Sequence, residues 1–257
     1  MTASTSTDAR DAWRTAARGG FAVSGLLHLV LAYLIVSIAI GSSAEADQST
    51  ALSRLQDLPL GTALLWIAAA ALVALGLWQL ADALRDGDLK DRGKAAAKGV
   101  LYLALAGTTM SVILGSSGGG DGQATGFAST LMAAPAGRLL VGLIGLGIVA
   151  GGAYHVHKGV TKGFEEDLKT PSHEEVGTGI RVTGTIGYVG KGLALGAVGV
   201  LFAIAAIQAD PDEAKGVDGA LEALLGLPGG PALVAAIGVG FAAYGLYSFG
   251  RARYARM

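Results

Sequence analysis

Long apolar runs alternate with polar segments along the whole chain. Six runs contain no Asp, Glu, Lys or Arg: Gly19–Ala44, Leu58–Ala81, Gly99–Gly120, Leu139–His157, Gly192–Ala209 and Ala223–Gly250. A membrane core about 30 Å thick needs about 20 apolar residues in a helix. The shortest run reaches that length when it is extended backwards through Lys191 to Val182. A membrane β-barrel would alternate over segments of about 10 residues, so these continuous runs predict six transmembrane helices.

The runs repeat in pairs with a fixed spacing. A Pro stands near the start of every second run, and 19 residues later comes an aromatic residue, two positions after a Gly. The three markers are Pro59, Pro135 and Pro228, and the Gly lies 17 residues beyond each, at Gly76, Gly152 and Gly245. A second set of glycines precedes each Pro by 34, 36 and 36 residues, at Gly25, Gly99 and Gly192. Chance matches in Ala- and Gly-rich sequence would not keep this spacing.

The spacing predicts an all-α integral membrane protein built from three tandem helical hairpins. Each hairpin leaves the cytoplasm, carries a weakly amphipathic helix outside, and returns after the Pro, which we expect in the first helical turn. Hairpins that all start on one side are parallel repeats around an axis along the membrane normal, which predicts pseudo-threefold symmetry. The expected parts are an N-terminal tail (1–17), hairpins at 18–84 and 92–160, a cytoplasmic linker (161–180) and a third hairpin at 181–252.

Glycine is the residue type that the repeats use most consistently. Transmembrane helices gain little hydrophobic energy from one another, so small residues that allow close backbone contact stabilise their association. We therefore expect helix contacts at the repeated glycines and at two small-xxx-small patterns. The candidate packing residues are Gly25, Gly76, Gly99, Gly147, Gly151, Gly152, Gly192, Gly196 and Gly245.

Composition agrees with a membrane protein. Hydrophobic residues make up 52% of the 257 and charged residues only 15%, against about 25% charged in soluble domains. There is no cysteine, which excludes disulfides, thiolate metal sites and cysteine nucleophiles. A net charge of −1 gives no reason to expect a nucleic-acid partner.

The cations are divided unequally between the two predicted sides. Sixteen of the 19 Lys and Arg residues fall on the side of the termini, and Arg54, Arg138 and Lys215 fall on the other. The positive-inside rule therefore predicts cytoplasmic termini. An alternative is a cleaved signal peptide ending near Ala44-Glu45-Ala46, but the first run is longer than the usual apolar core of about 7–15 residues.

The repeat resembles a known family. Gly187-Tyr188-Val189-Gly190-Lys191-Gly192 fits a Gly-aromatic-x-x-basic-Gly opening that is typical of actinobacterial six-span proteins of domain of unknown function 1206. Gly20 to Gly25 departs from it at Ser24, and the middle copy has Lys94 and Ala95 in place of the first Gly and the aromatic. The resemblance extends from about Trp13 to Arg253. It implies the fold and a bacterial inner membrane, and it implies no activity.

Two sets of equivalent polar positions lie near the cytoplasmic ends of the spans. Ser24, Lys98 and Lys191 form one set; Gln79, His155 and Ser248 form the other. They predict either polar rings at an inner vestibule or, alternatively, side chains that reach back to the headgroups. We expect Arg138 to reach outward in the same way.

His28 is the ionisable residue deepest in a span, about 12 Å along the helix axis from Gly20 at 1.5 Å per residue. An intramembrane His is a candidate for proton relay, haem ligation or substrate contact. A neutral His hydrogen-bonded to a neighbouring helix is the structural alternative.

These observations favour a structural or partner-binding membrane component that is not an enzyme. The alternative is a small transporter or channel with a pathway along the pseudo-threefold axis, using the polar residues above. A third hypothesis is a haem or redox protein that uses His28. We expect no catalytic residue, metal site or cofactor, because no nucleotide, metalloprotease or nucleophile-elbow motif occurs. Membrane lipids, other membrane proteins or a second copy are the expected partners.

Overall fold

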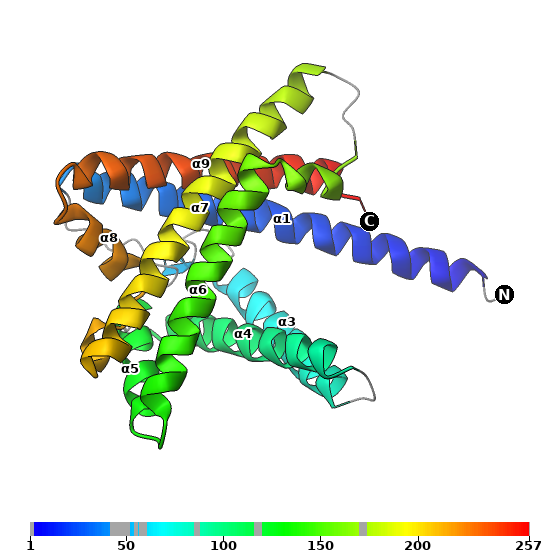
Figure 1. Ribbon diagram of the computed structural model, residues 1–257. Helices are drawn as coiled ribbons and strands as arrows, with labels where there is room; N and C mark the ends of the chain where they lie inside the picture. The colour runs from blue at the N-terminus through cyan, green and yellow to red at the C-terminus, as the bar shows by residue number, and fades with distance from the viewer. Residues whose placement is uncertain are drawn as a thin grey trace. The chain divides into compact units, whose positions relative to one another are not determined.

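The structure is a computed structural model that describes residues 3–41, 52–53, 56, 61–84, 88–115, 120–169 and 174–256. This part of the chain contains six long helices (Figure 1): α1 (Ala3–Ala39), α3 (Gly61–Ala83), α4 (Leu89–Ile113), α6 (Gly137–Val160), α7 (Glu174–Gln208) and α9 (Gly230–Tyr254). Each contains a stretch that is long and apolar enough to cross a membrane, which in α1 is Arg18–Ala39. The described residues contain no β-strand. The prediction of an all-α, six-span membrane protein is therefore confirmed.

Two compact units make up the chain. The first contains residues 1–47 and 120–257, with α1, α6, α7 and α9 and the shorter α5 (Gly120–Met132), η1 (Gly163–Asp167), η2 (Pro211–Glu213) and α8 (Val217–Leu225). The second contains residues 48–119, with α3 and α4.

The most extensive contacts join helices of successive repeats. In the first unit α6 packs along α7, and α1 packs along α9 (Figure 1); in the second unit α3 packs along α4. In each pair the returning helix of one repeat meets the leaving helix of the next, and the last repeat meets the first. Within a repeat, α7 also contacts α9 in the first unit.

Glycine contacts explain why these pairs form. Gly152 meets Gly192 in α6·α7, Gly76 meets Gly99 in α3·α4, and Gly25 meets Gly245 in α1·α9. In each pair, a Cβ built on one glycine would lie 2.6–3.2 Å from the carbonyl oxygen of the other. The two sets of repeat-equivalent glycines thus pair with each other in all three contacts.

The α6·α7 contact uses three glycines of α6. Gly145, Gly152 and Gly159 recur every seven residues on α6, and each faces the backbone of α7. The partner positions fall as the α6 numbers rise, so the helices are antiparallel. Seven-residue spacing keeps small residues on one seam of two helices that cross at a shallow angle.

Three predicted packing glycines behave differently. A Cβ on Gly147, Gly151 or Gly196 would meet nothing within 4 Å among the described residues. Gly147 and Gly151 lie on a face of α6 away from the α7 seam, whereas the backbone of Gly196 receives Gly152. The small-xxx-small pattern of Gly147 and Gly151 therefore does not mark the contact with α7, because that seam follows the seven-residue period.

In the second and third repeats the corner before the returning helix is a tight turn, not a helical first turn. Pro135 precedes Ala136 with φ +60°, and Pro228 precedes Gly229 with φ +78°. Backbone hydrogen bonds from Gly137 to Ala134 (2.9 Å) and from Gly230 to Leu227 (2.8 Å) close these turns. Pro followed by a positive φ is a type II turn. The prediction that Pro starts the returning helix was therefore wrong by two residues; in the first repeat Pro59 lies outside the described residues.

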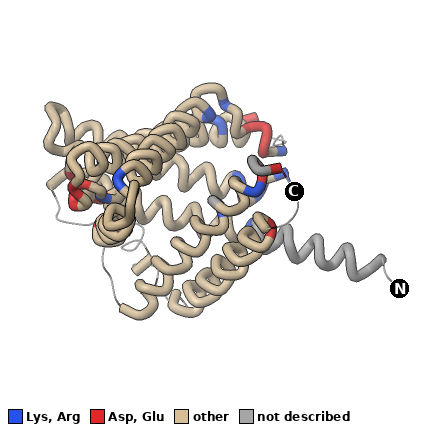
Figure 2. Tube along the Cα trace, turned by 60° about the horizontal axis from the view of Figure 1, so that its bottom comes forward, with Lys and Arg blue, Asp and Glu red and all other residues tan. Residues whose placement is uncertain are grey.

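The connections opposite the termini contain the expected short helices in two repeats, α5 and α8. One carboxylate oxygen of Asp121 in α5 accepts hydrogen bonds from the amides of Gly216 (2.8 Å) and Gly219 (3.1 Å) at the start of α8. A carboxylate at a helix N-terminus is stabilising. The corresponding segment of the first repeat lies mostly outside the described residues. Figure 2 shows that most charged residues of the first unit lie at the two ends of its spans.

Candidate functional site

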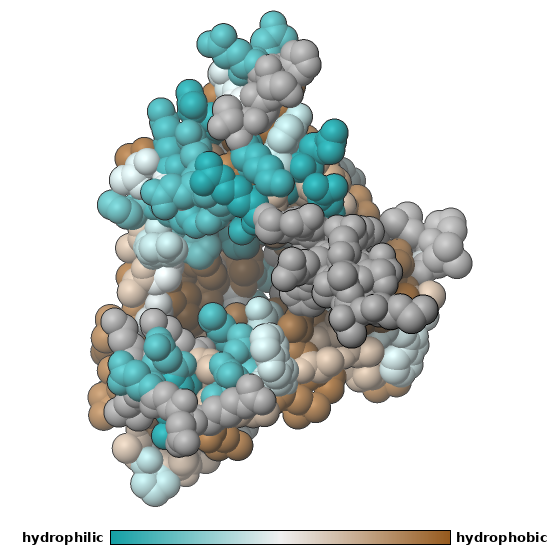
Figure 3. Space-filling model, turned by 90° about the vertical axis from the view of Figure 1, so that its right-hand side faces the viewer, coloured by the Kyte–Doolittle hydropathy of each residue, from teal (hydrophilic) through white to brown (hydrophobic). Residues whose placement is uncertain are grey.

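Aromatic and charged side chains converge in the first unit, where α6 ends, α7 begins and α9 approaches the C-terminus. We call them the basic–aromatic cluster, and its members are His28, Lys158, Phe164, Asp167, Tyr188, Lys191, Tyr244, Tyr247 and Arg251. Figure 3 shows hydrophilic side chains gathered over this end of the unit. A buried aromatic group, Phe164, Tyr188 and Tyr247, forms its centre.

His28 joins α1 to α7 and α9. Its Nδ1 lies 2.7 Å from the carbonyl oxygen of Ser24, which can only accept, so Nδ1 donates. The lone pair of Nε2 then faces Nζ of Lys191 at 3.3 Å. The imidazole ring packs on Tyr244, with centroids 4.6 Å apart. The two predicted intramembrane residues, His28 and Lys191, are therefore brought into direct contact.

Lys191 is held inside the unit without a carboxylate. Its ammonium donates to His28 and lies 4.5 Å from the centroid of the Tyr244 ring. No carboxylate among the described residues lies within ion-pair distance of it. A partly buried ammonium with only a neutral acceptor and a π face is incompletely compensated.

Asp167 supplies the carboxylate at the rim of the cluster. It pairs with Lys158 at 2.9 Å and with Arg251 at 3.9 Å. The guanidinium of Arg251 also stacks over Phe21, 4.5 Å from the ring centroid. The rim is partly exposed, since the side chain of Asp167 keeps 40% of its accessible surface and that of Arg251 keeps 27%.

Two donors in this cluster have no partner. The hydroxyl of Tyr247 is fully buried, and Nε of Arg251 is buried as well, yet neither has a hydrogen-bond partner among the described residues. Sequence reasoning missed these residues. Tyr244, Tyr247 and Arg251 follow one face of α9 at i, i+3 and i+7, and that spacing was the available signal.

The other predicted polar positions lie on several helices and in both units. His155 and Ser248 each bond back to a carbonyl one turn earlier in their own helix, at 2.9 Å and 2.8 Å. Gln79 is half-buried on α3 and Lys98 is exposed on α4, both in the second unit. Ser24 contributes chiefly its carbonyl oxygen to His28.

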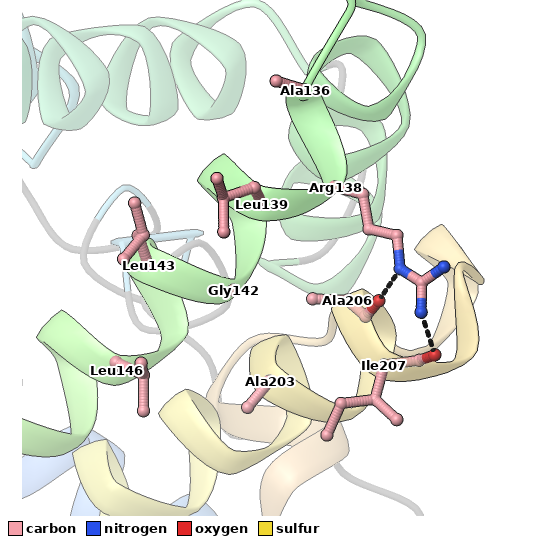
Figure 4. Close-up of a pocket in the computed structure, with 9 residues that line it drawn as sticks. All are labelled: Ala136, Arg138, Leu139, Gly142, Leu143, Leu146, Ala203, Ala206 and Ile207. Carbon is pink, nitrogen blue, oxygen red and sulfur yellow. Dashed lines mark hydrogen bonds between the residues drawn. The ribbon is translucent and has the colours of Figure 1, made fainter.

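A second feature is an apolar groove between α6 and α7, at the opposite end of these helices (Figure 4). Its volume is about 580 Å³. Three small residues, Gly142, Ala203 and Ala206, leave room in it, and four larger residues bound it: Leu139, Leu143, Leu146 and Ile207. We call it the α6–α7 groove.

Arg138 stands at the end of this groove. It does not simply reach outward, as the sequence suggested, but folds over the end of α7 and donates to the carbonyl oxygens of Ala206 and Ile207. A cation at the carbonyl end of a helix is stabilising. Only part of its donor capacity is used, because a guanidinium carries five N–H groups.

Comparison with known proteins agrees with the repeat and the fold. The family model "Domain of Unknown Function (DUF1206)" matches three times, at residues 19–86, 93–162 and 186–255. An "Uncharacterized protein YxxB" of Bacillus subtilis (strain 168) is 26% identical over 249 residues, which cover 93% of this chain and 90% of that protein. No solved structure matches significantly. The three matches confirm three tandem repeats, and the chain belongs to the DUF1206 family.

Proposed function

We propose that this protein is a structural, partner-binding component of the bacterial inner membrane and not an enzyme, and that it holds a phospholipid in the α6–α7 groove. The observation that carries the proposal is this apolar groove of about 580 Å³ with an arginine at its end. Sites for small ligands usually have volumes of about 300–1,000 Å³.

Charge complementarity favours a phospholipid as the occupant. Arg138 has no carboxylate partner within ion-pair distance among the residues that the structure describes, and part of its guanidinium is free of the α7 carbonyls. Arginine binds phosphate strongly through paired N–H groups. A headgroup phosphate on Arg138 would leave an acyl chain beside Leu139, Leu143 and Leu146, where burial of apolar surface is favourable.

Photocrosslinking tests this occupant. The protein would be reconstituted in nanodiscs with a phospholipid that carries a photoreactive acyl chain, and adducts would be mapped by mass spectrometry. We expect adducts concentrated on Leu139, Leu143, Leu146 and Ile207. Ala203→Phe, which places a large side chain in the groove, should remove most of these adducts.

Two further variants distinguish a lipid held in the groove from lipid that contacts any exposed apolar surface. Val239→Phe on α9 is the matched control, because Val239 is exposed on a different helix, and it should leave the adducts unchanged. Arg138→Gln should reduce labelling by a phosphate-bearing probe. Uniform labelling of all exposed apolar positions would overturn the proposal, as would labelling that Ala203→Phe does not reduce.

Cytoplasmic termini are part of this proposal and follow from the unequal distribution of cations. Because the chain has no cysteine, single cysteines can be introduced and labelled from either side. Arg256→Cys should react with an impermeant thiol reagent only after the cells are opened, and Asp212→Cys should react in intact spheroplasts. The reverse pattern would refute this orientation.

A small transporter is the second candidate, and the contact of His28 with Lys191 inside the spans favours it. Intramembrane ionisable residues often mark transport pathways. Liposome flux measurements on wild type and His28→Ala would test it; equal flux would exclude a role for His28. Haem ligation by His28 is not proposed, because Ser24 and Lys191 engage both ring nitrogens.

A further inference from the structure

We propose that Lys191, Tyr247 and Arg251 form a binding site for a phosphate-type oxyanion within the basic–aromatic cluster. This site lies at the end of the helices opposite the α6–α7 groove, and it does not depend on what that groove holds. Two buried donors there lack hydrogen-bond acceptors among the described residues, and the three cations of the cluster outnumber its one carboxylate.

The unpartnered donors come first. The Tyr247 side chain is 0% exposed, and its hydroxyl has no hydrogen-bond partner among the described residues. The buried Nε of Arg251 also lacks one. Leaving a buried donor unsatisfied costs about 1–3 kcal/mol, so folded proteins normally supply an acceptor.

Charge points to the kind of acceptor. Lys158, Lys191 and Arg251 belong to the cluster, and Asp167 is the carboxylate that pairs with two of them. Lys191 lies over the ring of Tyr244, whose centroid is 5.8 Å from that of Tyr247, and no carboxylate among the described residues pairs with it. Its contact with His28 adds no negative charge, because Nε2 offers only a lone pair. The cluster therefore carries an excess of positive charge.

A phosphate group would accept hydrogen bonds from the unpartnered donors and also balance the excess positive charge. It offers several acceptor oxygens and at least one negative charge, whereas water offers acceptors without charge. Phe21 covers one face of the Arg251 guanidinium, so the N–H groups point outward in the plane, as in the usual recognition of phosphate by arginine. The Asp167–Arg251 contact at 3.9 Å is long, and the partly exposed rim provides access from water.

Two sources share this chemistry: an anionic lipid headgroup and a soluble phosphate compound. The test uses the full chain in nanodiscs of phosphatidylcholine and measures the melting temperature and inorganic phosphate affinity. A parallel series replaces part of the lipid with phosphatidylglycerol and adds no phosphate. Stabilisation by phosphate alone would assign a soluble ligand; stabilisation by phosphatidylglycerol alone would assign a headgroup.

Two conservative substitutions provide the decisive comparison. Tyr247→Phe removes only the hydroxyl and keeps the ring packing, and Lys191→Met removes the charge but retains a flexible apolar chain. Each substitution should lower the affinity for the oxyanion that stabilises the wild type by about tenfold, the usual effect of losing a charge-assisted hydrogen bond. The matched controls are Tyr33→Phe, whose side chain is 73% exposed on α1, and Lys162→Met, which is exposed beyond α6. Both should respond like the wild type.

General salt effects can also stabilise proteins, because phosphate is excluded from apolar surface. Such an effect would be the same in all variants. Equal stabilisation of wild type, Tyr247→Phe and Lys191→Met would therefore overturn the proposal, as would no response of the wild type to either source. If Lys191→Met does not fold, Tyr247→Phe alone decides the question.

Discussion

The α6·α7 and α3·α4 contacts use equivalent glycines but differ in what each glycine meets. In α6·α7 a Cβ on Gly152 would lie 2.6 Å from the carbonyl oxygen of Gly192 and 2.8 Å from the amide of Gly196. In α3·α4 a Cβ on Gly76 would first meet the side chain of Leu103, at 2.7 Å, and the carbonyl of Gly99 only at 3.2 Å. The same repeated position is thus closed by rigid backbone in one contact and by a rotatable side chain in the other.

This difference shows that the repeat determines which positions need glycine, but not how well each position tolerates a larger residue. Backbone atoms cannot yield without moving a whole helix, whereas a leucine can change its rotamer. A ranking of tolerance among the three contacts follows, and substitution by alanine can test it.

Gly152→Ala should have the largest effect. Its methyl group would overlap the α7 backbone, and overpacking of this kind costs about 1–3 kcal/mol; we expect about 3 kcal/mol of unfolding free energy here. Thermal unfolding in detergent, followed by circular dichroism, would measure it. Gly151→Ala is the matched control because its Cβ meets nothing. A loss in Gly151→Ala as large as that in Gly152→Ala would contradict the seven-residue seam.

Gly245→Ala should cost less, about 2 kcal/mol. Its Cβ would lie 2.9 Å from both the Gly25 carbonyl oxygen and Cγ of Leu29, so one obstacle is backbone and the other can move. The same melting experiment would place it between the other two contacts. Gly20→Ala on α1, where a Cβ meets nothing, controls for the general effect of alanine in a helix. A cost equal to that of Gly152→Ala would mean that the Leu29 side chain is as rigid as backbone.

The sequence predicted much of this packing because the intervals between the marker residues are nearly the same in the three repeats, although the residues between them differ. The apolar runs and the Gly–Pro intervals predicted the six spans, the three repeats and the glycines Gly25, Gly76 and Gly152. They could not distinguish Gly151 from Gly152, since adjacent glycines differ only in which helix face they occupy. That face is set by the partner helix, and the partner belongs to the next repeat.

The candidate site was less accessible to sequence reasoning. His28 and Lys191 were identified singly, because charged or polar residues in apolar runs are conspicuous. Their contact joins residues 163 positions apart and depends on the packing of the last repeat on the first. Tyr247 and Arg251 resembled ordinary interfacial residues, since burial of a hydroxyl or of one guanidinium nitrogen is a property of three packed helices.

Gly76→Ala should have a smaller effect, about 1 kcal/mol, because rotation of Leu103 can relieve the overlap. A double-mutant cycle sharpens the comparison. Leu103→Ala removes the obstacle, so Gly76→Ala should cost less in that background than in the wild type, with a positive coupling of the size usual for contacting residues. Gly107→Ala on α4, where a Cβ meets nothing, is the control. Additive losses would show that the Gly99 carbonyl, not Leu103, limits this contact.

The smallest expected effect compares the two corner turns. Ala136 in the second repeat and Gly229 in the third occupy the same position after Pro, both with positive φ. A left-handed conformation costs an alanine about 1–2 kcal/mol, but glycine pays about 0.5–1 kcal/mol more conformational entropy on folding. Ala136→Gly should therefore raise the unfolding free energy by about 0.5 kcal/mol, and Gly229→Ala should lower it by a similar amount. Melting temperatures that move in opposite directions would confirm that one turn type serves both repeats, whereas a loss of stability in Ala136→Gly would show that its methyl group contributes packing that outweighs the strain.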